Sequence, residues 1–524
     1  MSRRVVVIGG GVAGLASAAL LAADGYEVDL IERRAELGGR AGSWSQDGFR
    51  FDTGPSWWLM PEVFDHFFEL LGTSTAERVA LTTLDPGYRV FFEGYDDPID
   101  LSADADVNQA LFESVEPGAG QRFSDYLRSG AQTYRMAVDR FLYSNFNSAA
   151  SFSGREMIAA LPLLARLLTQ SLERFIDDRF TDRRLRQILG YPAVFLGSSP
   201  SRAPALYHLM SGLDLADGVR YPMGGFTCLV DALIEVATEN GVRLHPDTTA
   251  TQILTTPNTA RGLRDRRRAQ VSGVAVLDSA GTRRTMPADI VIGAADLHHL
   301  ETQMLPARLQ TYPQKWWGKR TSGPGAVLVF LGVAGELPEL AHHTLFFTAD
   351  WASNFDAIFG EPTRIPDPAS IYVCRPSATD HSVAPDGYEN LFILVPVPAD
   401  PGLGAGGVGG AGSAEIEQAA DRAISTVAQW AGVADLAERI VVRRTMGPGD
   451  FAADLNSWCG GALGPAHTLR QSAFFRADNR SHRVAGLYYA GSSTRPGIGL
   501  PMCLISAELV RKHVRGDRSA GPTS

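Results

Sequence analysis

The stretch that decides the fold is residues 5–42, which read VVVIGGGVAGLASAALLAADGYEVDLIERRAELGGRAG. A short run of β-branched residues leads into the motif Gly9-x-Gly11-x-x-Gly14, an Ala- and Leu-rich helical segment follows, and a second apolar run ends at Glu32. A strand, a glycine-rich turn, a helix and a second strand make up a βαβ unit. The stretch therefore predicts the opening of a Rossmann-like α/β sheet.

Each part of this unit has a physical role in binding a dinucleotide. Gly9 permits the tight turn, Gly11 lets the backbone approach a pyrophosphate, and Gly14 lets the helix pack closely on the sheet, while the helix N-terminus offers N–H groups to the phosphates. Glu32 is placed to accept hydrogen bonds from ribose hydroxyls and would repel a 2′-phosphate, which disfavours NADP. We assign its neighbour Arg33 to the same site. Such turns also occur for packing alone, but the strand, the helix and the acid together favour dinucleotide binding.

A second glycine pair distinguishes between dinucleotides. Gly38-Gly39-Arg40, just past the acidic strand end, resembles the extended motif of the FAD-dependent amine oxidase and phytoene desaturase superfamily. In that superfamily the motif lies against the pyrophosphate and the flavin. The resemblance therefore implies FAD rather than NAD.

A predicted hairpin follows, because Asp47-Gly48 separates two short alternating runs. Asp52-Thr-Gly54-Pro55 then turns the chain. This segment resembles the bacterial and fungal phytoene desaturases, in which a strand ending in D-x-G-P leads to the flavin ring. The resemblance implies that Gly54 and Pro55 contact the cofactor.

The composition limits the classes of function. The chain has 524 residues, of which 45% are hydrophobic and 20% charged, enough for two or three layered domains. Its net charge of −10 argues against nucleic acid as the main partner and against a bulk electrostatic hold on anionic lipid. Any membrane contact should therefore be apolar and local.

The four cysteines show no metal-ligand spacing and are expected to be buried small hydrophobes in a reducing compartment. The glycine cluster explains the N-terminal apolar run better than a signal peptide does, so we expect no cleaved signal. No apolar run of the sequence approaches the roughly 18–20 residues that a spanning helix needs. We expect a protein that is soluble or lies on a membrane.

Residues 61 to about 215 carry apolar residues at three- and four-residue steps, which predicts amphipathic helices. Within them, residues 155–180 are the most apolar. This segment fits a core helix of a substrate domain, and the alternative is a surface that dips into a bilayer to collect a lipid, because both share one pattern. Both interpretations stay open.

The chain's return toward the dinucleotide sheet is marked by Pro222 and the pair Gly224-Gly225, which predict a close-approach turn before a helix. In the resembling family the corresponding turn lies near flavin and substrate, which implies that Gly224 and Gly225 lie near the substrate. A plain helix-leading turn is the alternative. Later strands, at 326–333, 371–374 and 391–397, suggest the sheet of a substrate domain.

The pair His342-His343 is also typical of the carotenoid branch. Adjacent residues on a strand point to opposite faces, and no carboxylate is spaced to complete a ligand set. We therefore expect a structural role for the pair and no metal site in the chain.

The C-terminal stretch 487–501 reads LYYAGSSTRPGIGLP, and it is followed by a helix. A strand, a Gly/Ser/Pro turn and a helix start place free N–H groups beside an anionic or electron-rich ligand. The stretch resembles the motif A-G-x-x-T-x-P-G-x-G-x-P position by position. The flavin contacts that this implies are Gly491, Ser492, Gly499, Leu500 and Pro501.

Taken in order, these motifs are similar over essentially the full length to those of phytoene desaturase-type carotenoid desaturases. The resemblance implies an FAD enzyme acting on a long polyisoprenoid: hydride leaves an allylic carbon to flavin N5, a neighbouring proton is lost, and a double bond forms. Glu156 is the nearest match to the acidic residue considered for acid/base work in the family. A basic residue that can follow one turn later is replaced by Ala159, so a plain surface charge is the alternative for Glu156.

Other functions stay open. Within the branch they are a carotenoid isomerase, a ketolase, or a desaturase acting on a shorter or later carotenoid. A different class is a non-catalytic prenyl-lipid-binding protein of related fold, such as the GDP-dissociation inhibitors. The intact stretches 38–40 and 490–501 argue against that class.

The expected architecture is α/β, with a Rossmann-like FAD-binding domain, a mixed-sheet substrate domain and a helical region that contacts membrane or substrate. We expect a cytoplasmic enzyme, peripheral on the inner face of the cell membrane, with a carotenoid or other long isoprenoid as substrate and quinone or oxygen as electron acceptor. The predicted divisions are 1–75, 220–300 and 470–524 for the FAD-binding domain, 76–130 and 301–469 for the substrate-binding domain, and 131–219 for the helical region.

Overall fold

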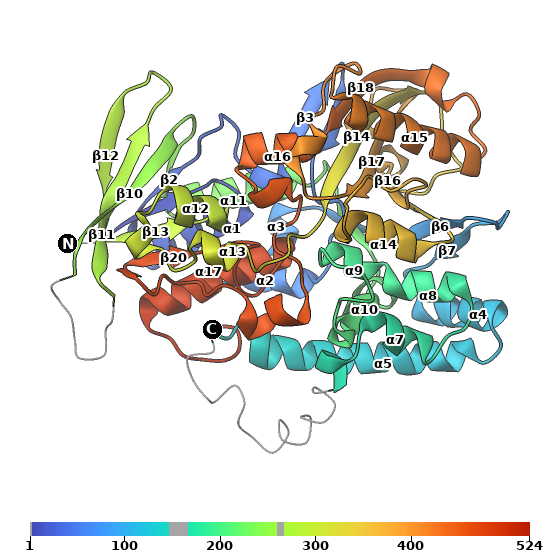
Figure 1. The fold of residues 1–524 in the computed structure, drawn as a ribbon, viewed down its shortest axis with the longest axis horizontal. Coiled ribbons are helices and arrows are strands. Elements are labelled where there is room, and N and C mark those ends of the chain that lie inside the picture. The colour runs from blue at the N-terminus through green and yellow to red at the C-terminus, as the bar shows by residue number, and fades with distance from the viewer. Residues whose placement is uncertain (1–2, 146–165, 259–266, 524) are drawn as a thin grey trace.

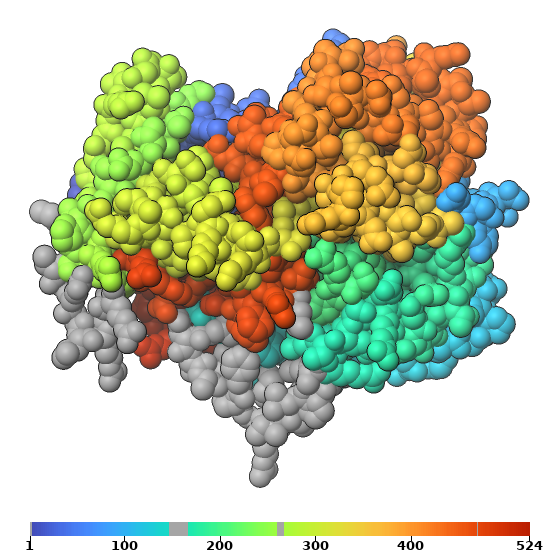
Figure 2. Space-filling model, in the orientation of Figure 1, coloured from blue at the N-terminus to red at the C-terminus, as the bar shows by residue number. Residues whose placement is uncertain are grey.

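The structure, a computed structural model, describes residues 3–145, 166–258 and 267–523. Their strands form a five-stranded, a four-stranded and a seven-stranded sheet, together with two two-stranded ones. Figure 1 shows the five-stranded and seven-stranded sheets in different halves of the molecule, with a group of helices below the second. On the face seen in Figure 2, the lobe of the four-stranded sheet and the lobe of the seven-stranded sheet are separated by a notch.

The five-stranded sheet is parallel throughout and is centred on the N-terminal strand β1. Strand alternation gives it two buried faces, because Val5 and Val7 belong to one core cluster and Val6 and Ile8 to another. The strand order is β20 (Leu487–Tyr489), β13 (Ile290–Gly293), β1 (Arg4–Ile8), β2 (Glu27–Ile31) and β9 (Arg243–His245).

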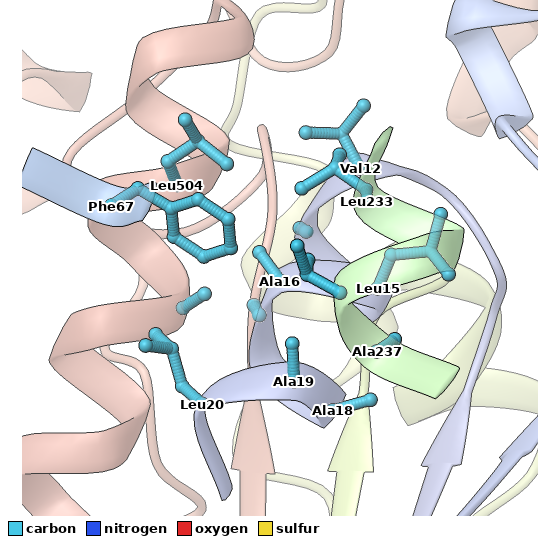
Figure 3. Close-up of a cluster of buried hydrophobic side chains, with 14 of the residues drawn as sticks. Val12, Leu15, Ala16, Ala18, Ala19, Leu20, Phe67, Leu233, Ala237 and Leu504 are labelled. Atoms are coloured by element: carbon cyan, nitrogen blue, oxygen red, sulfur yellow. The ribbon is translucent and has the colours of Figure 1, made fainter. Parts of the chain in front are cut away.

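Three helices cover one face of this sheet, namely α1 (Val12–Ala23), α11 (Thr227–Glu239) and α17 (Leu500–Arg515). Helix α1 is buried on all sides, and its many alanines let both neighbours approach closely. Figure 3 shows the side chains of α1 between Leu504 of α17 and Leu233 of α11. This packing fixes the N-termini of α1 and α17 relative to each other.

The seven-stranded sheet is antiparallel except where β15 pairs with β6. Alternate residues of β14 face a core under helix α15 (Ala414–Trp430), while Ala326 and Leu328 face the opposite side. The order is β18 (Ile440–Met446), β14 (Gly325–Ala334), β17 (Tyr388–Val397), β16 (Ile371–Cys374), β15 (His343–Phe347), β6 (Tyr88–Phe92) and β7 (Ile99–Leu101).

A helical region packs against that opposite side, where its aromatic residues share one core with the sheet. The helices are α4 (Ala105–Val115), α5 (Ala119–Ala137), α7 (Leu172–Asp177), α8 (Arg183–Gly190), α9 (Pro192–Phe195) and α10 (Leu209–Leu215).

The remaining elements complete the sheets and connect the two halves. The four-stranded sheet has β10 (Thr249–Pro257), β11 (Ala269–Leu277) and β12 (Arg283–Pro287), with β19 (Val484–Ala485) beside β11. The two-stranded sheets are β3 (Ser43–Gln46) with β4 (Phe49–Asp52), and β5 (Leu81–Thr83) with β8 (Arg220–Pro222). The other α-helices are α2 (Pro61–Glu69), α3 (Thr75–Arg78), α12 (Leu297–Gln303), α13 (Gln314–Trp317), α14 (Trp351–Phe359) and α16 (Pro448–Leu455).

Three details differ from the sequence-based expectations. The segment 61–215 is not helical throughout, because β5, β6 and β7 interrupt it and two of these strands complete the seven-stranded sheet. The predicted division between residues 130 and 131 falls inside α5. The other domain limits stay predictions. Of the four cysteines expected to be buried, Cys374 is buried, Cys228 and Cys503 are half-buried, and Cys459 is exposed. Within the ranges that the structure describes, no helix has both the length and the apolar character needed to cross a membrane.

Candidate functional site

The turn between β1 and α1 is shaped for a pyrophosphate. Gly9 has φ +106°, and a Cβ on Gly14 would lie 1.9 Å from the carbonyl oxygen of Gly9, so only glycine fits there. Gly11 caps α1 without a side-chain hydrogen bond, and the first turn holds no acidic residue. The N–H groups at this helix start are therefore available to an anion.

Glu32 is held at the same turn by two backbone bonds. Its Oε2 accepts a 2.8 Å hydrogen bond from the N–H of Gly10, and its Oε1 accepts one of 3.0 Å from Arg34. The adjacent Arg33 extends across to α16, where it donates to the carbonyl of Ala453 at 2.5 Å. The carboxylate thus lies beside the glycine turn, where a ribose would approach.

The second glycine pair packs on the first turn. Gly38 and Gly39 have φ +116° and +59°, and a Cβ on Gly39 would lie 3.2 Å from Cα of Gly11. Arg40 donates through Nε to the carbonyl of Ala462 at 3.0 Å and through Nη2 to Ser457 Oγ at 3.0 Å. These bonds tie the N-terminal unit to the loop after α16.

The D-x-G-P turn and the C-terminal loop complete the arrangement. A Cβ on Gly54 would lie 1.9 Å from the Arg40 carbonyl oxygen, so the turn packs directly on the backbone that follows the glycine pair. Gly491 has φ +117° and faces Ala13, while Gly499 caps α17 without a side-chain bond. The first turn of α17 therefore offers a second set of free N–H groups.

One cavity of about 1060 Å³ connects these motifs with the seven-stranded sheet and the helical region. Every residue predicted to bind the cofactor and described here lines it except Gly14, which is tucked under the turn. The same cavity is lined by apolar side chains from both halves of the molecule, among them Trp57, Phe195, Leu206, Met210, Ala326, Leu328, Phe392, Leu394, Met446 and Phe451.

The placement of Gly224 and Gly225 near the substrate stays a prediction. Neither is among the described residues that line the cavity. The N–H of Gly224 donates to Asp380 Oδ2 at 2.6 Å, and a Cβ on Gly225 would lie 2.8 Å from Asp52 Oδ2. The turn carries glycines because both residues have positive φ, +93° and +83°, and because the Cys228 sulfur and the Asp52 carboxylate leave no room for a Cβ.

Sequence reasoning missed one polar pair beside the cavity and one buried arginine that bonds to the C-terminal loop. Tyr207 Oη lies 2.6 Å from His467 Nδ1, and His467 Nε2 accepts a 3.3 Å hydrogen bond from the N–H of Ile498. Burial, and then the charge of Arg476, holds the pKa of His467 well below its usual range, so the ring is neutral. The buried Arg476 donates to the carbonyls of Thr494 and Ser492 and so braces the C-terminal loop.

The prediction that the side chains of His342 and His343 point to opposite faces of a strand is wrong. His342 precedes β15, and its ring centroid lies 4.6 Å from that of His343. Three potential metal-ligand atoms lie within 4.8 Å of one another, one each from His342, His343 and Cys374. Strand alternation therefore gives no reason to exclude a metal here. Glu156 lies outside the described residues.

Comparisons with known proteins agree with this arrangement. The sequence pattern of the family described as flavin containing amine oxidoreductase matches residues 12–510. The chain is 41% identical to a carotenoid 3,4-desaturase of Haloarcula japonica, covering 96% of both chains, and 34% identical to a zeta-carotene-forming phytoene desaturase of Myxococcus xanthus, covering 98% of this chain and 94% of that one. A phytoene desaturase of Fusarium fujikuroi is 32% identical over 99% of this chain and 90% of its own.

Solved structures agree on the fold. An oxidoreductase from Methanosarcina mazei superposes with a TM-score of 0.59 at 17% identity, covering 97% of this chain and 100% of that chain. A putrescine oxidase bound to putrescine superposes with a TM-score of 0.58 at 15% identity, covering 98% and 99%. At these identities the likeness concerns the fold alone.

Proposed function

The chain belongs to the flavin-containing amine oxidoreductase family and, within it, to the carotenoid desaturases, and we propose that it desaturates phytoene or a closely related long polyisoprenoid. The observation that carries the proposal is the single cavity lined both by the dinucleotide motifs and by apolar side chains of the sheet and helices. A cofactor and an apolar chain held in one cavity can bring a reacting carbon to the redox centre.

FAD is the cofactor, and the residues present fit it. The starts of α1 and α17 have no side-chain cap, so their N–H groups can bind the phosphates, and glycines let the backbone come close to them. Glu32, beside the turn, can bind the ribose. When bound, FAD supplies the two-electron acceptor that takes up a hydride.

The protein's own contribution is to orient the substrate and to exclude water. Ala326 and Leu328 of β14 and Leu206 of the helical region offer no charge to a hydrocarbon chain, so the chain can bind by its apolar surface alone. Tyr207 and the neutral His467 add one polar pair to this wall, held in place by the N–H of Ile498. A reacting bond enclosed in this way is removed from bulk water.

We retain Glu156 as the proposed proton acceptor on the basis of the family resemblance. Glu156→Gln should slow turnover while the flavin content stays normal. Unchanged turnover with normal flavin would remove Glu156 from the proposal.

A second candidate is later-step desaturation near the end of a carotenoid. The relative at 41% identity carries the name carotenoid 3,4-desaturase, which favours this reaction over others in the branch. The chain should be expressed in cells that supply phytoene and, separately, in cells that supply a carotenoid saturated at the 3,4 bond. The supplied compound whose absorption shifts to longer wavelength, with a loss of two hydrogens for each new double bond, is the substrate.

Product masses from the same cultures separate the remaining alternatives. An isomerase leaves the mass unchanged, and a ketolase adds oxygen. A prenyl-binding protein gives no product and a colourless purified protein. Any of these results would overturn the desaturase proposal.

We also propose that the protein works at the cytoplasmic face of the cell membrane. An apolar substrate that resides in lipid and a net charge of −10 support an apolar, local contact rather than an electrostatic one. Helix α7 buries Leu172, Phe175 and Ile176, which favours a core role for that part of 155–180. Co-sedimentation with uncharged vesicles, undiminished by salt, is expected; binding only to anionic vesicles would contradict the proposal.

Quinone or oxygen is the proposed electron acceptor. Both accept electrons from reduced flavins, and the residues that line the cavity do not favour one acceptor over the other. Product formation should therefore be compared under anaerobic conditions with and without a soluble quinone. Turnover that requires neither would contradict the proposal.

A further inference from the structure

Two histidines and one cysteine meet behind the cavity wall. His343 begins β15, Cys374 ends β16, and the antiparallel register places these two residues directly opposite each other. His342 precedes the strand, and one ligand atom from each of the three residues lies within 4.8 Å of the other two. We call these residues the His–His–Cys cluster.

Both imidazoles are held by one nitrogen and left free at the other. Tyr372 Oη donates to Ser56 Oγ at 2.7 Å, so the same oxygen accepts from His343 Nδ1 at 2.7 Å, which leaves a lone pair on His343 Nε2. His342 Nδ1 lies 2.8 Å from Thr379 Oγ1. Among the described residues neither Nε2 has a hydrogen-bond partner, although His342 is 5% and His343 0% exposed. Buried nitrogens without partners are costly and point to a missing ligand.

The two imidazoles are uncharged, as metal ligation requires. Burial, and then the charge of Arg375, lowers the pKa of His342 to about 3, and burial holds the pKa of His343 far below its usual range. Both rings are therefore neutral and ready to donate a lone pair. Burial raises the pKa of the Cys374 thiol, and a bound cation would supply the charge that stabilises its thiolate.

We propose that the His–His–Cys cluster binds one soft closed-shell metal ion, Zn²⁺ or Cu⁺, that ties β15 to β16. Two imidazoles and one thiolate are ligands that these ions share. A hydrogen bond on the other nitrogen of each imidazole is the usual support of a metal-bound histidine. The ligand atoms of one such ion lie about 3.3–3.8 Å apart, so the cluster must close by about 1 Å.

The ion would brace the wall of the cavity. The indole of Trp57 stacks on His343 with ring centroids 4.7 Å apart, and both Trp57 and Tyr372 line the cavity. None of the three ligands is itself among the lining residues. The site is therefore separate from flavin binding and does not rest on the proposed reaction.

The test uses full-length, flavin-loaded protein produced with added zinc or added copper and then desalted under reducing conditions. Elemental analysis should give about one Zn or one Cu per chain for the wild type. Cys374→Ser and His342→Gln should reduce the metal at least ten-fold with the flavin unchanged. Cys459→Ser removes an exposed thiol and should leave the metal in place. The ion retained in stoichiometric amount distinguishes zinc from copper.

Three results would overturn the proposal: a wild type that retains neither ion, a Cys374→Ser variant that retains it fully, and a metal lost with Cys459→Ser instead. If the cluster variants fail to fold, X-ray absorption of the loaded wild type decides. One sulfur near 2.3 Å and nitrogens near 2.0–2.1 Å are expected for zinc. A shell of oxygen alone would refute the site.

Discussion

The carboxylate of Asp52 accepts a 2.8 Å hydrogen bond from the backbone N–H of Phe226. This bond joins the D-x-G-P turn to the P-x-G-G turn, two motifs far apart in the sequence. Gly225 has no room for a side chain, because a Cβ there would lie 2.8 Å from Asp52 Oδ2. The contact therefore holds in place the turn that carries Gly54 and Pro55 in the cavity wall.

The Asp52 contact predicts a pH dependence of stability. Burial raises the pKa of Asp52 to about 6, against the opposing effects of the Phe226 N–H, Arg50 and Thr227. In the unfolded chain the pKa is about 3.9. The stabilising contribution of this acid is therefore present below about pH 4 and lost as the pH rises through 6.

Asp52→Asn should remove this loss of stability at higher pH, because an amide does not ionise. The difference in unfolding free energy between variant and wild type should grow in favour of the variant by up to about 3 kcal/mol from pH 4 to pH 7. Denaturant unfolding of the flavin-loaded proteins at both pH values measures it. A constant or shrinking difference would contradict the raised pKa.

Gly14→Ala should disrupt the cofactor turn. Its Cβ would lie 1.9 Å from the Gly9 carbonyl oxygen, so α1 must move, with an expected loss of about 1–3 kcal/mol or more and of tight FAD binding. The matched control is Gly212→Ala in α10, where the nearest atom lies 4.0 Å from the new Cβ. The control should keep its flavin and gain up to about 1 kcal/mol. Equal flavin content in the two variants would refute the predicted fit.

Filling the apolar part of the cavity should stop turnover without releasing flavin. Ala326→Trp places an indole where β14 lines the cavity, in a different sheet from the β1 strand that leads into the glycine turn. Turnover should fall at least ten-fold, while the flavin-to-protein ratio in the absorption spectrum stays near that of the wild type. Val441→Trp, at a β18 residue that is 55% exposed, is the control and should retain activity. Full activity of Ala326→Trp would show that the substrate binds elsewhere.

A buried ion pair should contribute strongly to the N-terminal half. Arg511 of α17 contacts the Asp24 carboxylate at 2.7 Å, with side chains 8% and 4% exposed. Asp24→Asn leaves a buried guanidinium with a weakened partner and should cost about 3–5 kcal/mol. Asp125→Asn breaks the exposed pair with Arg128 and should cost no more than about 1 kcal/mol. Similar melting temperatures for the two variants would contradict this ranking.

The sequence predicted those parts whose signal is local. The β-branched run before Gly9, the alanine-rich run after it and the acid at Glu32 each mark one element, and the structure has β1, α1 and β2 there. Glycine positions were also readable, because only glycine fits where backbone meets backbone. The resemblance of the C-terminal stretch then related the two ends of the chain.

Parts that depend on contacts between distant residues could not be read in the same way. Tyr207 and His467 are single residues in different segments, and no spacing connects them. The rule of strand alternation misled us at His342, because that residue lies outside β15 and its ring turns toward His343. The strands at 81–101 were overlooked because they are only three to five residues long and lie between helices.

The most direct test of the central claim is a single anaerobic turnover. The purified yellow protein is mixed, without oxygen or quinone, with phytoene in lipid vesicles and, in parallel, with a carotenoid saturated at the 3,4 bond. The account predicts bleaching of the flavin absorption with one substrate, together with an equimolar product two hydrogens lighter. An unbleached flavin and unchanged substrate masses in both mixtures would contradict it.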